Sequence, residues 1–344
     1  MEVRKVQITG GSTFTVSLPK AWATETGIEA GSELAFYPEG NTLVATPSNV
    51  PSEASTTLAV EDVSPQELES RLVTLYINGF DEIVLEADRI TTAQRRTIRT
   101  AATGLVGFEV SVETEDRMVL RDFLDPSELS VHDTVMQMRL LSFSMLEDAT
   151  EGLLEEDSDR IDGIAARDDD VDRLWYVTSR LFRAVLRDPR AAAAVDLDRE
   201  TCFDYRTCAR QIERIADHTV KIAGHSADLT ELPADIREPL GSLRIESLGI
   251  VENAMDAFLV EDRDRATELA TATLAQAAGM DARTRSIDEQ LGTADPADAQ
   301  LLGLVVDSLS RIGDYGANIA ETALQKAAPT PESKRTVRRD RNQA

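Results

Sequence analysis

Two segments of this chain that lie 97 residues apart are nearly alike, and this repetition constrains the fold more than any other feature. The first is Glu213–His225 (ERIADHTVKIAGH) and the second is Ser310–Thr322 (SRIGDYGANIAET). Arginine, isoleucine and aspartate recur at matching places, and so does an Ile-Ala pair. The apolar residues follow the spacing of one helix face. A helical segment repeated in this way predicts a duplicated helical unit.

The chain is strongly acidic, with 62 acidic residues, 36 basic residues and a formal net charge of −26. Almost all of its bases are arginine. An acid-rich, lysine-poor surface is typical of proteins that work in concentrated salt, where screening weakens the repulsion between carboxylates. We therefore expect a halophile's cytoplasmic protein, with an acidic mesophilic protein as the alternative. The absence of a long apolar run or a hydrophobic signal core predicts no membrane insertion.

Hydrophobic periodicity predicts a multidomain chain. Residues 1–49 have the pattern of a small β domain, with strands at Val3–Ile8 and Phe14–Leu18, a helix at Lys20–Glu25, and a closing hairpin. Residues 50–126 read as a small α/β domain in the order strand, helix, strand, helix, strand, strand. Residues 127–328 are all-α. Residues 329–344 read as a basic disordered tail.

The helical segment divides into two copies of three helices each. The expected ranges are 129–156, 158–187 and 197–225 in the first copy, and 234–261, 263–291 and 296–327 in the second. An Asp-Pro pair precedes the third helix of both copies, at Asp188-Pro189 and at Asp295-Pro296. This shared break ahead of the third helix supports the duplication independently of the repeated segment.

Glu213 and Asp217 are four residues apart, so they lie one turn above the other on the same helix. Such a carboxylate pair facing another helix is a natural clamp for a hard cation. Ion pairing of these acids with Arg206 and Arg210 on the same face is an alternative. The preceding helix carries Asp168, Asp169 and Asp172, which would meet the pair if the two helices pack antiparallel.

The stretches RDDDVDRLWY, IERIADHTVKIA and LSRIGDYGANIAE resemble the PhoU family over about residues 127–328. That resemblance implies tandem three-helix bundles, restraint of phosphate uptake, and multinuclear metal sites. By position it assigns metal binding in the first copy to Asp168, Asp169, Asp172, Glu213 and Asp217, and in the second copy to Asp281 and Asp314. The second copy departs from the family, since Ser310 stands where Glu213 has its counterpart. The implied cofactor is a divalent or trivalent ion: iron, manganese, zinc or magnesium.

Residues 1–49 (with SLPKAW and GIEAGSEL) resemble the AbrB/MazE/SpoVT family of swapped-hairpin domains. The resemblance implies a homodimer and places Arg4, Lys5, Ser12, Thr13 and Lys20 at DNA. Only three bases accompany five acids in residues 1–50, which is a weak footprint for phosphate-backbone binding. A dimer clasp without DNA binding is the alternative. The two resemblances together match archaeal PhoU-like proteins that carry an AbrB-like head.

The expected function is therefore a cytoplasmic regulator of phosphate uptake that acts through a metal-binding helical body and a DNA-binding head. We expect no catalysis, because the chain shows no nucleophile–base order and no phosphate loop. A phosphate transporter or signalling protein is the implied protein partner. Two alternatives remain open: an AbrB-type transcription factor whose helical body only mediates oligomerisation, and a metal store. The α/β segment is expected to be a structural connector or a dimerisation module, with a small-ligand sensor as the alternative.

Overall fold

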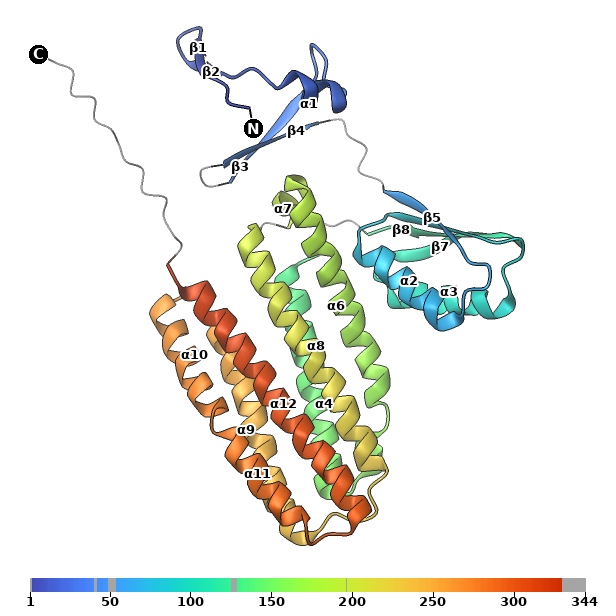
Figure 1. The fold of residues 1–344 in the computed structure, drawn as a ribbon, viewed down its shortest axis with the longest axis vertical. Helices are drawn as coiled ribbons and strands as arrows, with labels where there is room; N and C mark the ends of the chain where they lie inside the picture. Colours follow the sequence, from blue (N-terminus) through green and yellow to red (C-terminus); the bar gives the residue numbers. More distant parts are fainter. Residues whose placement is uncertain (1, 40–41, 49–53, 125–128, 196, 330–344) are drawn as a thin grey trace, which may run out of the picture. The chain divides into compact units, whose positions relative to one another are not determined.

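The computed structural model describes residues 2–39, 42–48, 54–124, 129–195 and 197–329 of the chain (Figure 1). The chain divides into two compact units, residues 1–54 and residues 55–344. From position 330 onward, the expected basic tail lies outside the described residues. Within the described ranges, no helix combines the length and apolar character needed to cross a membrane.

The first unit consists of two antiparallel hairpins and one short helix. Strand β1 (Gln7–Thr9) pairs with β2 (Thr13–Thr15), and β3 (Leu34–Glu39) pairs with β4 (Thr42–Pro47). Helix α1 (Lys20–Glu25) lies between the hairpins along the chain and has the predicted bounds. The turn of the first hairpin holds Gly10 and Gly11 at φ values of 64° and 84°, which side chains other than glycine rarely adopt.

The first two strands are shorter than their sequence pattern predicts. The pairing of β1 with β2 spans three residues, from Gln7 opposite Thr15 to Thr9 opposite Thr13. The alternation that begins at Val3 therefore runs beyond the length of the partner strand. Residues without a partner strand cannot form the ladder of hydrogen bonds that defines a strand, however suitable their side chains are.

The second unit begins with a two-layer α/β domain. Strands β5 (Ser55–Ala59), β6 (Glu82–Glu86), β7 (Phe108–Glu113) and β8 (Arg117–Asp122) form one sheet in the order β5-β6-β8-β7. Only β5 and β6 are parallel, because α2 (Pro65–Ile77) crosses between them. Helix α2 and α3 (Thr92–Gly104) cover one face of the sheet in Figure 1, around a core that includes Leu72, Ile83 and Ile98. The predicted order of elements is confirmed.

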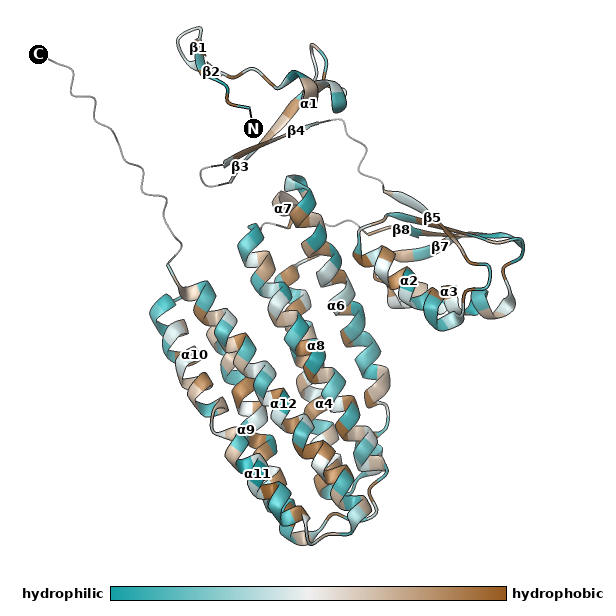
Figure 2. Ribbon diagram, in the orientation of Figure 1, coloured by the Kyte–Doolittle hydropathy of each residue, from teal (hydrophilic) through white to brown (hydrophobic). Residues whose placement is uncertain are grey.

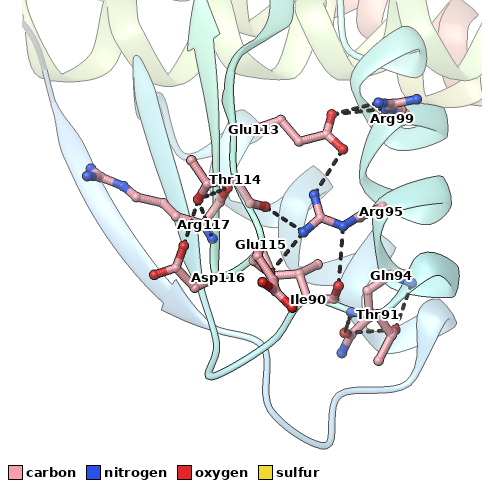
Figure 3. Close-up of polar contacts among 10 residues, drawn as sticks. All are labelled: Ile90, Thr91, Gln94, Arg95, Arg99, Glu113, Thr114, Glu115, Asp116 and Arg117. Carbon is pink, nitrogen blue, oxygen red and sulfur yellow. Dashed lines mark hydrogen bonds and ion pairs between the residues drawn. The ribbon is translucent and has the colours of Figure 1, made fainter.

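Arginines of α3 fasten the β7–β8 hairpin to this helix (Figure 3). Arg95 donates to the backbone oxygens of Ile90, Thr114 and Glu115, and to the Glu113 carboxylate at 2.9 Å. Arg99 binds the other oxygen of Glu113 at 2.7 Å. The Thr91 hydroxyl caps the start of the helix. These arginines therefore have a structural role in the α/β domain.

The remainder of the second unit is a pair of helical bundles, as the repeat predicts. The first bundle contains α4 (Val131–Glu155), α6 (Ile164–Arg187) and α8 (Arg199–Ala227), and the second contains α9 (Ala234–Leu259), α10 (Arg263–Ala277), α11 (Met280–Leu291) and α12 (Pro296–Ala327). One continuous core joins the two bundles, and α8 packs against α12. Figure 2 shows apolar and polar residues interleaved along each of these helices, as expected for helices buried on one side.

The middle helix of each copy is interrupted where the sequence pattern predicts one continuous helix. In the first copy, α5 (Ser158–Ile161) ends before Gly163, whose φ of 84° is left-handed and breaks the helix. In the second copy, the expected helix 263–291 divides at Ala278 and Gly279. There the Gly279 amide bonds the Gln276 oxygen, one residue closer than in an α-helix. Glycine is a poor helix former, so both interruptions fall at glycine.

The Asp-Pro pairs have different roles in the two copies. Asp295 caps α12 directly, with its side chain accepting from the Ala297 amide. Asp188 instead caps a short extra helix, α7 (Pro189–Ala194), and α8 begins later under its own cap, Asp198. The third helix of the first copy thus begins within two residues of its expected start at 197, and Asp188-Pro189 marks the expected break ahead of it.

Candidate functional site

Helices α6 and α8 bring five carboxylates together in an acidic seam, formed by Asp168, Asp169 and Asp172 of α6 and by Glu213 and Asp217 of α8. Contacts between the two helices pair the beginning of α6 with the end of α8, so the helices are antiparallel. The spacing of three or four residues keeps each set on one helix face. The first-copy acids singled out from the sequence therefore lie near one another, with Asp169 and Asp217 exposed at the surface.

Burial, with repulsion from neighbouring acids, raises the pKa of three acids of the seam: Asp168, Asp172 and Glu213. Burial, followed by Asp172, Asp217 and Asp169, raises the pKa of Asp168 to about 7. Burial also raises the pKa of Glu213 to about 7, with Asp217 and Asp172 adding to the effect against the opposing charge of Arg210. The pKa of Asp172 is raised, chiefly by burial. Each of these carboxylates is thus held where ionisation is unfavourable without a compensating cation.

Neighbouring polar groups form hydrogen bonds with only some of the carboxylate oxygens in the seam. One Glu213 oxygen accepts from Arg210 at 2.6 Å, while the buried Oε2 has no hydrogen-bond partner. The Tyr176 hydroxyl donates to Asp172 at 3.2 Å. Ion pairing with Arg210, the alternative suggested by the sequence, is therefore real but leaves one buried glutamate oxygen unpaired. An unpaired buried acceptor is costly and calls for a ligand or a counter-ion.

The donor chemistry of the seam fits a hard cation, because it offers carboxylate oxygens and no thiolate or imidazole. Across the described ranges of the chain, no three histidine, cysteine, aspartate or glutamate side chains converge closely enough to enclose a metal ion as they stand. Cation binding would thus require the seam carboxylates to turn toward one another.

The corresponding acids of the second copy do not form a similar seam. Asp281 is exposed at the start of α11. Asp314 is exposed on α12 and accepts from Arg311 at 3.3 Å. Another acid of α11, Asp288, interacts with α12: its pKa is raised by burial and then by the charge of Asp307. Asp288 is itself exposed and lies two turns after Asp281 on the same side of α11, and alignment of the copies did not single it out.

A cleft of about 670 Å³ adjoins the seam, where the α/β domain meets α6. Glu69 of α2 and Thr100 of α3 line one side, and Asp169, Asp172 and Tyr176 line the other. Tyr176 packs against the cores of both the α/β domain and the bundle. The α/β domain is therefore one wall of the acidic site, which the sequence pattern did not reveal.

Arg180 of α6 joins the two parts of this unit, and it too escaped the sequence analysis. Its guanidinium donates to the backbone oxygens of Tyr76 and Phe80 and to the carboxylates of Asp81 and Asp122, at 2.7–2.9 Å. It also lies 4.9 Å from the ring centroid of Tyr76. An arginine in the polar half of an amphipathic helix resembles a surface residue until its partner domain is known.

In the first unit, the residues assigned to DNA are all exposed. Ser12 and Thr13 are in or beside the β1–β2 turn, Lys20 begins α1, and Arg4 and Lys5 precede β1. Arg4 is paired with Glu2 at 2.7 Å. The side chains of this unit are thus accessible, and one of its three bases is partly neutralised.

Comparisons with known proteins agree with this division of the chain. Residues 135–225 match the PhoU domain family, and residues 7–52 match the family described as "Antidote-toxin recognition MazE, bacterial antitoxin". A search of curated proteins found no match.

The solved structures that resemble the chain include two PhoU proteins. The PhoU structure from Pseudomonas aeruginosa has a TM-score of 0.50 and 23% identity, and it covers 58% of this chain and 96% of its own. The phosphate transport system regulatory protein PhoU from Streptococcus pneumoniae has a TM-score of 0.49 and 16% identity, and it covers 59% of this chain and 96% of its own. The first likeness shows that the helical body has the fold of PhoU proteins.

Proposed function

We propose that this chain, which carries a PhoU domain and a MazE-like domain, is a regulator that restrains phosphate uptake. The observation that carries the proposal is the match of residues 135–225 to the PhoU domain, because this segment contains the whole acidic seam. The phosphate transport system regulatory protein among the similar structures suggests the same role. A transporter or a signalling protein of the phosphate system is the corresponding partner.

Phosphate uptake in a deletion strain tests this function. Loss of the protein should raise uptake when phosphate is plentiful, and the wild-type chain should restore restraint. A complementing variant with Glu213→Gln and Asp217→Asn should restore it less well, whereas Asp314→Asn, at an exposed position, should behave as wild type. Unchanged uptake in the deletion strain would refute the proposed role.

We further propose that the acidic seam binds a hard cation as part of this role. Oxygen donors favour magnesium, manganese or iron(III), while zinc more often takes nitrogen and sulfur ligands. The unpaired Oε2 of Glu213 and the raised pKa values of Asp168 and Glu213 support the binding of a cation, whose positive charge would compensate these carboxylates. Elemental analysis should find metal in the wild type and less in Glu213→Gln/Asp217→Asn. Equal metal in the two would refute the seam as its site.

The head is proposed to dimerise with a second copy. None of its described residues is buried, and it exposes a large set of apolar side chains: Val3, Val6, Ile8, Phe14, Val16, Phe36 and Leu43. Isolated two-stranded hairpins are marginal in water, so this unit requires a partner surface to form a core. Phe14→Ser should reduce the dimeric fraction in light scattering, while Leu140→Ser on the bundle should not. An unchanged dimer in Phe14→Ser would contradict this interface.

DNA binding by the head is a second candidate function, favoured by the match of residues 7–52 to MazE. Arg4, Lys5, Ser12, Thr13 and Lys20 are the proposed contacts. Arg4→Ala/Lys5→Ala should abolish promoter retention in a mobility-shift assay and leave the dimer intact. Retention of DNA by this variant would exclude Arg4 and Lys5 as contacts, whereas no retention by the wild type would leave the head as a dimer clasp.

A further inference from the structure

The face of the first bundle beside the acidic seam carries aromatic rings with arginines stacked on them. The Arg206 guanidinium of α8 lies 5.1 Å from the ring centroid of Trp175 and 5.4 Å from that of Phe182, both on α6. Arg210 lies 5.3 Å from the Trp175 ring. Phe203 adjoins Phe182, with ring centroids 6.0 Å apart. Stacking on rings in this way holds a guanidinium extended and restricts its rotamers.

The charge of Arg206 is not compensated by an acid. Within residues 129–195 and 197–329, and in the described α/β domain, no carboxylate forms an ion pair with it, although the chain has 62 acids and 36 bases. Its charged neighbours are instead Arg183 and Arg210, which together with burial lower the pKa of its guanidinium. Arg183 is exposed and bonds only the neutral Asn78 side chain, at 2.9 Å. Like charges gathered in an acidic protein indicate that a negative ligand belongs there.

Bundle packing does not explain these arginines. The positions of α12 that correspond to Phe203, Arg206 and Arg210 are Gln300, Gly303 and Asp307. The second bundle therefore forms its third helix with no base and no aromatic ring at these places. The aromatic and arginine residues are an addition specific to the first bundle, beside the helix pair that also holds the acidic seam.

We propose that Arg183 and Arg206 form a binding site for a tetrahedral oxyanion of the phosphate class, with Arg210 at its edge. The guanidinium fork donates two parallel hydrogen bonds to phosphate oxygens, and two such forks suit a doubly charged anion. Leu186 and Phe203 are each about half exposed at this face, 50% and 49%, and their apolar surface reduces the competition from water. This inference rests on the proposed function only for the choice of phosphate as the oxyanion.

Tryptophan fluorescence tests the site directly. The chain has two tryptophans, so Trp22→Phe leaves Trp175 beneath Arg206 as the sole reporter. The purified full-length protein is titrated with inorganic phosphate, with potassium chloride adjusted to hold ionic strength constant. We expect a saturable change in Trp175 emission. Arg206→Gln should weaken the apparent affinity at least about tenfold, the loss expected for one charge-assisted hydrogen-bonded contact.

Two further variants keep the test decisive. Arg183→Gln alters an exposed side chain, leaves the stacked rings in place, and should also weaken binding. Arg263→Gln, at the exposed start of α10, is the matched control and should bind as the parent does. A parallel titration with O-phosphoserine distinguishes free phosphate from a phosphoryl group on a partner, because the tighter ligand identifies the source.

A linear response, or a saturable response that persists unchanged in Arg206→Gln and Arg183→Gln, would overturn the oxyanion site. The uptake assay in the deletion strain is independent of this measurement. Altered uptake without phosphate binding would support the proposed function and reject the oxyanion site. Phosphate binding with unaltered uptake would support the oxyanion site and reject the proposed function.

Discussion

His218 and Tyr315 occupy equivalent positions in the two repeats, 97 residues apart, and they contact each other where α8 packs on α12. The Tyr315 hydroxyl lies 3.3 Å from His218 Nε2, and the ring centroids are 5.6 Å apart. A residue that meets its own counterpart lies beside the rotation axis relating two copies, as in an isologous interface. The duplicated bundles therefore associate much as two subunits of a symmetric dimer would.

Acidification should destabilise this junction through His218. Burial, then Lys221, lowers the pKa of His218 from 6.5, against the opposing effects of Asp307 and Asp217. The folded state therefore binds this proton less readily than the unfolded state. Neutral His218 therefore stabilises the folded state above pH 6.5, and this stabilisation is lost as pH falls through the folded-state pKa of His218. Thermal melts should show a smaller loss of stability on acidification in His218→Gln than in wild type or Tyr315→Phe. Identical pH profiles would contradict this role of His218.

The acidic seam should give the opposite pH dependence in chelator-treated protein. The pKa values of Asp168 and Glu213 are raised to about 7 from 3.8 and 4.5. The contribution of these two acids to the free energy of unfolding is therefore fully present below their unfolded-state pKa values. It is lost as pH rises through their folded-state pKa of about 7. Glu213→Gln should reduce this loss in denaturant unfolding, and adding the bound metal should reverse it in wild type. The exposed Asp314→Asn serves as the control for general charge repulsion. If Glu213→Gln leaves the dependence of the free energy of unfolding on pH unchanged, Glu213 is not the source of that dependence.

Two glycines of α12 should respond oppositely to alanine. A Cβ at Gly316 would lie 2.8 Å from Ile250 Cγ2 and 3.1 Å from the Val251 nitrogen, so close packing of α12 on α9 requires glycine there. Overpacking should lower the free energy of unfolding by about 1–3 kcal/mol in Gly316→Ala. Nothing lies within 4 Å of a Cβ at Gly303, so Gly303→Ala should raise it by about 0.5–1 kcal/mol. Chemical denaturation of both variants measures the difference, and equal effects would contradict this packing.

Removal of the Arg180 guanidinium should loosen the α/β domain from the bundle. Arg180→Met leaves the Asp122 carboxylate buried without its partner, and burial already raises the pKa of Asp122. Breaking such a buried pair should cost about 3–5 kcal/mol of unfolding free energy. Arg173→Met, whose side chain is 44% exposed in a pair with Asp170, should cost less than about 1 kcal/mol. Hydrogen exchange in residues 76–81 should then be faster in Arg180→Met but not in Arg173→Met. Equal protection of these residues in both variants would contradict the role of Arg180 in holding the α/β domain to the bundle.

Periodicity and caps predicted much of the fold because they act between residues close in the chain. Helix α1 has its expected bounds, and the elements of the α/β domain follow in the expected order. The i, i+4 spacing of Glu213 and Asp217 likewise placed both on one helix face. Antiparallel packing of the preceding helix was only a condition in the sequence analysis, and the structure meets it. The interruption at Gly279 was missed because the apolar pattern continues across it.

The sequence by itself determined that a helical unit was duplicated and that acids recur on its third helix, since both follow from spacing along one helix. Only the tertiary structure decided which acids lie near a neighbouring helix, that Asp307 of α12 acts on Asp288 of α11, and that Arg180 is buried against another domain. It also revealed that Arg206 stacks on aromatic rings and forms no ion pair with an acid among the described residues. Burial and charge pairing depend on elements far apart in the chain, so local pattern carries no information about them.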